Sequence, residues 1–330
     1  MSDPLISTLA GVVTNATPLV IAAMGETITE RAGIVNLSLD GSIVLSAMSG
    51  FVVAYSTQQL LVANAGMTAP EAAGLSVVVG AIGAMVVGAL VALLIAFSSI
   101  SLRQDQVAIG FVLTLLGVDL AVFLGTNYAR IPGPQILPTD IPLLANIPVI
   151  GEIFFQQSWF AYISYLLVFG TWWVFFRTRQ GLSLRAVGEH PRAAETVGID
   201  VIRLRYKNVI GAGGLASLGG AFLSMEATAS FQQGMTAGRG FIGLAAMIVG
   251  RWSPLGAFGA ALLFASAQGL GQSIKIVPPA GELGNLLGSL PGQFFDALPY
   301  VVTIVVLAGL IGRSIPPAAD GQPYEREATA

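Results

Sequence analysis

The sequence predicts an all-α fold, a polytopic bundle of transmembrane helices, and its composition and hydropathy are the reasons. Hydrophobic residues make up 54% of the 330 residues and charged residues only 10%, against about 25% charged residues in soluble proteins. The mean hydropathy is +0.77, and apolar stretches close to the ~20 residues that cross a hydrocarbon layer recur along the chain. Glycine contributes 40 residues, and small residues let membrane helices approach one another.

About nine membrane segments are predicted, within a range of roughly eight to ten. They fall at residues 5–25, 34–55, 71–98, 107–125, 157–176, 207–229, 239–250, 255–272 and 293–312. The seventh is too short to span and is interpreted as a half-helix, which is tolerated where protein or a cavity surrounds it. We expect one transmembrane domain over residues 1–314, followed by a polar cytoplasmic tail, 315–330, that is predicted to be disordered.

The distribution of lysine and arginine predicts the orientation of the bundle. Seven of the 15 basic residues lie in the loop at 177–207, between the fifth and sixth segments. Because cytoplasmic loops are enriched in these residues, this loop is expected to be cytoplasmic. If successive segments cross the membrane in opposite directions on either side of this loop, twelve basic residues lie on the cytoplasmic side. Only Arg130, Arg239 and Lys275 then lie outside. With nine segments, the N-terminus is then external.

The residue inventory argues against an enzyme. The only histidine is His190, there is no cysteine, and neither Lys207 nor Lys275 follows a glycine. A phosphate-binding loop of the Walker A type requires Gly-Lys-Ser/Thr, so this chain cannot be an ATPase of that class. Metal sites built from histidine and cysteine are excluded by count. A Ser-His-Asp arrangement is not expected, because the lone His190 is in the cytoplasmic loop and is interpreted as part of a surface turn. No catalytic residue, cofactor or metal is therefore predicted in this chain.

The cytoplasmic loop contains a candidate docking helix for an external motor. A proline just inside its start and Gly198 just past its end predict about two helical turns from Pro191 to Val197. Two alanines predict a smooth face that fits a groove, and the nearby arginines can pair with acidic residues of a partner. The alternative is a basic loop that only sets topology. The candidate coupling residues are Gly188, Glu189, His190, Pro191, Arg192, Ala193, Ala194 and Glu195.

Polar residues within the membrane segments are candidates for a translocation pathway, because intramembrane ionisable groups are costly and suggest function. Asn36 and Asp40 are four residues apart and are expected to share one face of a helix. Two of these residues have an equally good structural interpretation. Asp40 could pack one helix against another, and Glu226 could cap its helix at the membrane interface. The candidates are Asn36, Asp40, Asp119, Glu226, Gln232 and Gln233.

Three segments, in this order, resemble the permeases of ABC importers of the branched-chain amino acid, simple-sugar and nucleoside superfamily. They are Glu30–Gly41, Gly188–Gly198, and Gly238–Ala246 leading to Gly250–Gly256. The resemblance covers about residues 15 to 312 and is greatest for the nucleoside branch. A departure occurs at residues 37–40, Leu-Ser-Leu-Asp, where the family more often has a glycine and a glutamate.

The resemblance implies a permease subunit that forms the pathway for a small polar solute, most plausibly nucleosides, in the plasma or inner membrane of a prokaryote. It also implies a second permease chain, ABC ATPase subunits that hold ATP and magnesium, and an extracytoplasmic substrate-binding lipoprotein. Membrane lipid is a further expected partner of this chain, and nucleic acid is not. A simple-sugar permease is the alternative within the family. An ion-coupled secondary transporter using Asp40, Asp119 or Glu226 is the rival outside it, and the predicted docking helix argues against that rival.

Overall fold

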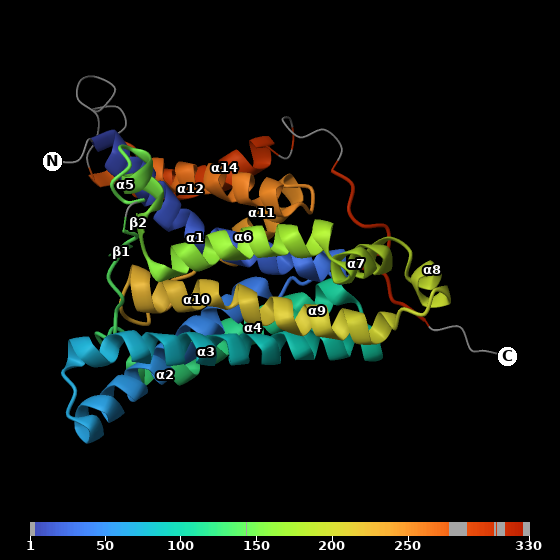
Figure 1. The fold of residues 1–330 in the computed structure, drawn as a ribbon, viewed down its shortest axis with the longest axis horizontal. Coiled ribbons are helices and arrows are strands. Elements are labelled where there is room, and N and C mark those ends of the chain that lie inside the picture. Colours follow the sequence, from blue (N-terminus) through green and yellow to red (C-terminus); the bar gives the residue numbers. More distant parts are fainter. Residues whose placement is uncertain (1–3, 143, 277–288, 307, 309–313, 326–330) are drawn as a thin grey trace.

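The computed structural model describes residues 4–142, 144–276, 289–306, 308 and 314–325. Within these ranges the chain is a bundle of long helices that lie side by side (Figure 1). Strands β1 (Thr139–Asp140) and β2 (Gln156–Gln157) form a short antiparallel pair in the loop between α4 and α6. The helices are α1 (Pro4–Arg31), α2 (Leu39–Ala65), α3 (Ala69–Ala96), α4 (Gln106–Gly125), α5 (Ile150–Phe154), α6 (Trp159–Arg177), α7 (Arg179–Glu189), α8 (Pro191–Thr196), α9 (Val201–Ala216), α10 (Leu218–Phe222), α11 (Arg239–Val249), α12 (Pro254–Ile276) and α14 (Gly292–Val305).

The predicted helical membrane bundle is confirmed, whereas the predicted number of nine spans is not. Among the described residues, seven helices are long and apolar enough to cross a membrane, and α11 and α14 are shorter apolar helices. The short α11 agrees with the predicted half-helix at 239–250. Part of the predicted ninth segment, residues 307 and 309–312, lies outside the described residues.

Helix α1 occupies the centre of the bundle. It packs against α12, α9, α11 and α6, and Leu19, Ile21 and Met24 in its middle are fully buried. Helices α2, α3 and α4 form one side of the molecule, while α11, α12 and α14 lie on the other (Figure 1). The central position of α1 explains why the side chains in its middle have no solvent contact.

Arginines at the end of the bundle that carries α7 and α8 contact neighbouring groups through ion pairs and hydrogen bonds. The helices of this end are labelled in Figure 1. Arg31 Nη1 lies 3.7 Å from Glu189 Oε1, and Arg103 Nη1 lies 2.7 Å from Glu325 Oε1. Arg251 is next to Trp252, whose carbonyl oxygen accepts a hydrogen bond from Arg31 Nε. This grouping agrees with a cytoplasmic placement of that end.

Glycine determines how closely α2 and α4 approach. A Cβ added at Gly41 would lie 2.5 Å from the Cα of Thr114, a distance that real contacts do not show, and Gly117 faces the Gly41 backbone in the same way. Because both neighbours are backbone atoms, neither helix can yield locally.

We therefore predict that Gly41→Ala lowers the free energy of unfolding by about 1–3 kcal/mol through overpacking. The check is the thermal midpoint of the purified protein in detergent. Gly74→Ala is the matched control, because nothing lies within 4 Å of a Cβ at Gly74. Equal midpoints for the two variants would contradict the close packing of α2 on α4.

Candidate functional site

Two helices begin inside the bundle rather than at its surface. After α1 ends at Arg31, the chain turns back and Asn36 N donates to Glu26 Oε1 at 3.1 Å. Glu26 precedes Arg31 by five residues, about 7 Å along α1, so α2 begins below the membrane boundary. Helix α11 has 11 residues, a length of about 16 Å or half of a hydrocarbon layer. It ends beside Trp252, at the end of the bundle that carries α7, so its N-terminus lies about halfway along the bundle.

Side chains hold the extended segment between α1 and α2. Backbone groups inside a membrane have no water to bind and require protein partners. The hydrogen bonds are Val35 N to Gln106 Oε1 (2.7 Å), Asn36 N to Glu26 Oε1 (3.1 Å), Thr114 Oγ1 to Leu37 O (2.7 Å) and Ser38 N to Asn36 Oδ1 (3.1 Å). The break in the helix is thus held by hydrogen bonds from side chains on α1 and α4.

The carboxylate of Asp40 connects the two helix starts. Its Oδ1 accepts a hydrogen bond from Gly240 N at 2.9 Å, and its Oδ2 accepts a longer one from Thr236 Oγ1 at 3.5 Å. Asp40 lies in the first turn of α2 and Gly240 in the first turn of α11, so both positive helix termini are close to one negative group. Gly240 makes this contact possible, since a Cβ there would collide with the Asp40 backbone.

The two helix starts also share a sequence pattern. The same residue types follow one another with the same spacing in both helices. They are Gly41, Ile43, Leu45, Ala47 and Met48 in α2, and Gly240, Ile242, Leu244, Ala246 and Met247 in α11. Helix α2 runs from the centre away from α7 and α8, whereas α11 runs from the centre toward them (Figure 1). Inverted segments that meet at interrupted helices near mid-membrane are the usual architecture of a transporter site.

The structure corrects two predictions about this region. Asn36 and Asp40 do not share a helical face, because α2 begins only at Leu39 and Asn36 is in the extended segment, where its Oδ1 accepts from Ser38. Arg239 was predicted to be external, but it is the first residue of α11 and is half-buried in the bundle. Gly33, with φ of 83°, provides the turn that shifts the start of α2 inward.

The other candidate pathway residues lie apart from this centre. Glu226 follows α10, at the far end of the helical run that begins with α9. Ser158 hydrogen-bonds to the Glu226 carboxylate, and the Glu226 carbonyl oxygen accepts from Gln135 Nε2 at 2.9 Å. Gln232 and Gln233 are exposed in the following loop, with Gln232 Nε2 bonded to Ser230 Oγ at 3.2 Å. Asp119 is exposed on α4. Of the candidates, the structure brings only Asn36 and Asp40 into one site.

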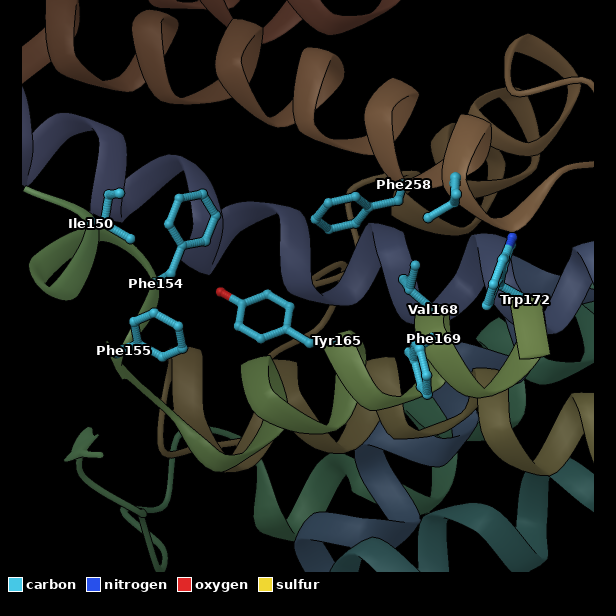
Figure 2. Close-up of a pocket in the computed structure, with 9 residues that line it drawn as sticks. Ile150, Phe154, Phe155, Tyr165, Val168, Phe169, Trp172 and Phe258 are labelled. Carbon is cyan, nitrogen blue, oxygen red and sulfur yellow. The ribbon is translucent and has the colours of Figure 1, made fainter. Parts of the chain in front are cut away.

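An apolar cavity of about 550 Å³ lies between α5, α6 and α12 (Figure 2). Phe154, Tyr165, Phe169 and Phe258 are among the side chains around it. Every described residue that lines it is aromatic or aliphatic, so it offers little to a polar solute. The polar centre at Asp40 is the better candidate.

The helix predicted from Pro191 to Val197 is present as α8, Pro191–Thr196. Pro191 is its first residue, and Gly198 past its end has φ of 87° and donates to Glu195 O at 2.9 Å. The predicted smooth face of two alanines is wrong: Ala194 is buried against Val187 and its neighbours, while Ala193 is exposed. Helix α7 was missed, although Thr178 caps it by accepting from Gly181 N at 3.2 Å.

The C-terminal segment contacts α7 and α8, where a disordered tail was expected. Ala319 N donates to Gly188 O at 2.9 Å, Ala318 N donates to Glu189 Oε2 at 3.1 Å, and the Tyr324 hydroxyl bonds to Glu195. Residues 326–330 of the predicted tail lie outside the described residues. Between this segment and α8 is a cleft of about 700 Å³, lined by Glu189–Ala193 and by tail residues that include Gln322 and Tyr324.

Polar contacts fix the tail to the bundle. Arg205 is 1% exposed, donates from Nη1 to Gln322 O at 3.3 Å and lies over the Tyr324 ring. The side chains of Asp320 and Glu30 hydrogen-bond to each other, which requires a proton on one of the two carboxyl groups. Burial raises the pKa of Asp320 to about 6, although Arg205 opposes this rise.

The chain matches the family model for the permease component of branched-chain amino acid transport systems over residues 8–307. It is 38% identical to the nucleoside ABC transporter permease NupC of Lactococcus lactis, over 97% of this chain and 98% of that protein. It is 36% identical to the guanosine permease NupQ of Bacillus subtilis, over 94% and 93%. It is 34% identical to the putative glucose permease TsgC13 of Haloferax volcanii, over 94% and 95%.

The chain therefore belongs to this family of permease components, as its motifs indicated. It is a membrane-spanning subunit of an ABC importer, a transport component with several transmembrane helices.

We predict that the tail binds α7 and α8 more tightly at acidic pH. The folded-state pKa of Asp320, about 6, is above the unfolded value of 3.8. Its contribution is therefore fully present below the unfolded pKa and is lost as the pH rises through about 6. Protection of residues 314–325 in hydrogen exchange, corrected for intrinsic rates, should fall about tenfold or more between about pH 5 and about pH 8.

Asp320→Asn is the control for this prediction, because it keeps the size of the side chain and removes the titration. Its protection should vary much less with pH. The same pH dependence in Asp320→Asn would assign the effect to another group.

Proposed function

We propose that this chain is the permease subunit of an ABC importer for nucleosides in the plasma or inner membrane of a prokaryote. The observation that carries the proposal is the similarity to NupC and NupQ, which extends over nearly the full length of all three chains. A simple sugar is the second candidate substrate, favoured by the similarity to TsgC13.

In this proposal ATP and magnesium bind to a separate ATPase subunit, since this chain lacks a Gly-Lys pair. The ATPase contacts the coupling residues on α8 and enters the cleft between α8 and the C-terminal segment. Glu189, Arg192 and Glu325 give that cleft charges of both signs, which suits a polar protein partner and determines its orientation.

A continuous set of contacts connects α8 to the intramembrane centre. Glu189 at the end of α7 pairs with Arg31 on α1, and Arg31 donates to the carbonyl of Trp252, just past α11. Helix α11 then extends from there to Gly240, which donates to Asp40. Movement of α7 and α8 by the ATPase would reach Asp40 through these contacts, because packed elements shift as units.

The pathway in this proposal is completed by a second permease chain, and an extracytoplasmic lipoprotein delivers the solute to the outer face. The candidate pathway residues remain Asn36, Asp40, Asp119, Glu226, Gln232 and Gln233. The loop that contains α5, β1 and β2 offers a folded surface for the delivery protein.

Uptake into proteoliposomes tests the function. The chain, reconstituted with its partner permease, ATPase and loaded binding protein, should accumulate radiolabelled guanosine only with internal ATP. Accumulation of glucose alone would favour the second candidate. Accumulation driven by an ion gradient without any ATPase would contradict the assignment as an ABC permease.

Arg192→Glu should uncouple ATP hydrolysis from transport, because it reverses an exposed charge on the outer face of α8. We expect the number of nucleosides transported per ATP to fall at least about tenfold while the amount of folded protein in the membrane stays the same. Arg179→Glu is the matched control, an exposed arginine at the opposite end of α7. Unchanged coupling in Arg192→Glu, or an equal loss in both variants, would count against docking at α8.

A further inference from the structure

A polar pocket adjoins the start of α11. It has a volume of about 220 Å³ and lies between α11, α12 and α14. Arg239, Gln268, Gln272, Phe295 and Tyr300 line it. None of the five was a candidate pathway residue, and Arg239 directly precedes the Gly240 that donates to Asp40.

One atom in this pocket lacks a partner. Gln268 Oε1 is buried and has no hydrogen bond among the described residues. Leaving a buried polar atom unpaired costs about 1–3 kcal/mol, so Gln268 presents an acceptor for a donor that a ligand would supply. The neighbouring polar groups are held in place: Arg239 Nη1 donates to Met235 O (3.1 Å) and to Thr236 O (3.2 Å), and Tyr300 Oη donates to Ala237 O (2.9 Å).

The polar lining of the pocket favours protein or water beside it over lipid. Gln272 and Tyr300 are exposed on the single chain, but an arginine and two glutamines within a membrane require protein or a water-filled path beside them. A second polar pocket, of about 270 Å³, lies on the other side of Gln272 and is lined by Thr8, Asn15 and Ser273. These residues are near the N-terminal end of α1, and Gln272 lines both pockets.

The side chains match the chemistry of a nucleoside. A nucleobase stacks on aromatic rings with a gain of about 1–3 kcal/mol per base, and Phe295 and Tyr300 provide two rings. Glutamine carboxamides pair with the mixed donor and acceptor edge of a purine, and Gln268 and Gln272 provide two such groups. An exocyclic amine or ring N–H would satisfy Gln268 Oε1.

We propose that this pocket binds the transported nucleoside on its way through the membrane, with the base recognised by Gln268 and Gln272 and stacked on Phe295 and Tyr300. The proposal rests on the nucleoside importer function above. In this proposal, α12 and α14 form the side of the molecule that faces the second permease. This side lines the translocation pathway that the two chains share.

Gln268→Leu is the principal test, in the complete reconstituted complex. It replaces an unpaired buried oxygen with apolar atoms of similar volume, so the thermal midpoint should stay the same or rise. The KM for guanosine uptake should rise about tenfold or more. Gln58→Leu is the matched control, because Gln58 is on α2, apart from the residues that line this pocket, and its Nε2 donates to Ala69 O at 2.9 Å.

The outcomes separate the two proposals. If wild-type complex takes up no nucleoside, the function is wrong. If wild type takes up guanosine and the KM values of Gln268→Leu and Gln58→Leu are equal, the function stands and the pocket is wrong. A lower thermal midpoint in Gln268→Leu together with reduced uptake would indicate a structural role for Gln268 and would also overturn the pocket assignment.

Photolabelling of the unmodified complex gives an independent measurement. An azido derivative of guanosine, activated during turnover, should label peptides from α12 or α14. Labelling confined to α4, where Asp119 is exposed, would place the pathway on the opposite side of the molecule and overturn the proposal.

Discussion

Helices α2 and α11 both begin within the bundle, and the carboxylate of Asp40 is the group that lets them begin there together. A helix start leaves backbone N–H groups without intrahelical partners, and a membrane provides no water to bind them. Asp40 accepts from Gly240 N and places a negative charge between two positive helix ends. The positions of Arg239 and of the polar pocket beside it depend on this contact.

The break before α2 requires support from distant parts of the chain. Glu26 on α1, and Gln106 and Thr114 on α4, bind backbone atoms of the extended segment. A continuous helix would satisfy the same atoms without any of these side chains. The chain retains an arrangement that needs more polar groups within the membrane, which is expected where irregular backbone serves a solute path rather than stability alone.

Sequence reasoning predicted what depends on local pattern. Hydropathy predicted the long helices, and the spacing of Pro191 and Gly198 predicted α8. It could not predict the partner of Asp40, because Gly240 is 200 residues away and contributes only a backbone N–H. Alternation of spans placed Arg239 outside, since a loop that re-enters the membrane does not obey that alternation. The contacts of Ala319 and Tyr324 were missed because a short polar tail has no periodicity.

The inverted directions of α2 and α11 explain how one site can respond to an event at the cytoplasmic surface. The far end of α11 is linked through Trp252 and Arg31 to Glu189, beside α8. Its near end is held at Asp40, from which α2 leads to the opposite face. The proposed coupling route from α8 therefore ends at the point where the two half-helices meet, beside Asp40 and Arg239. Rocking of inverted segments about a fixed central site is the physical basis of alternating access.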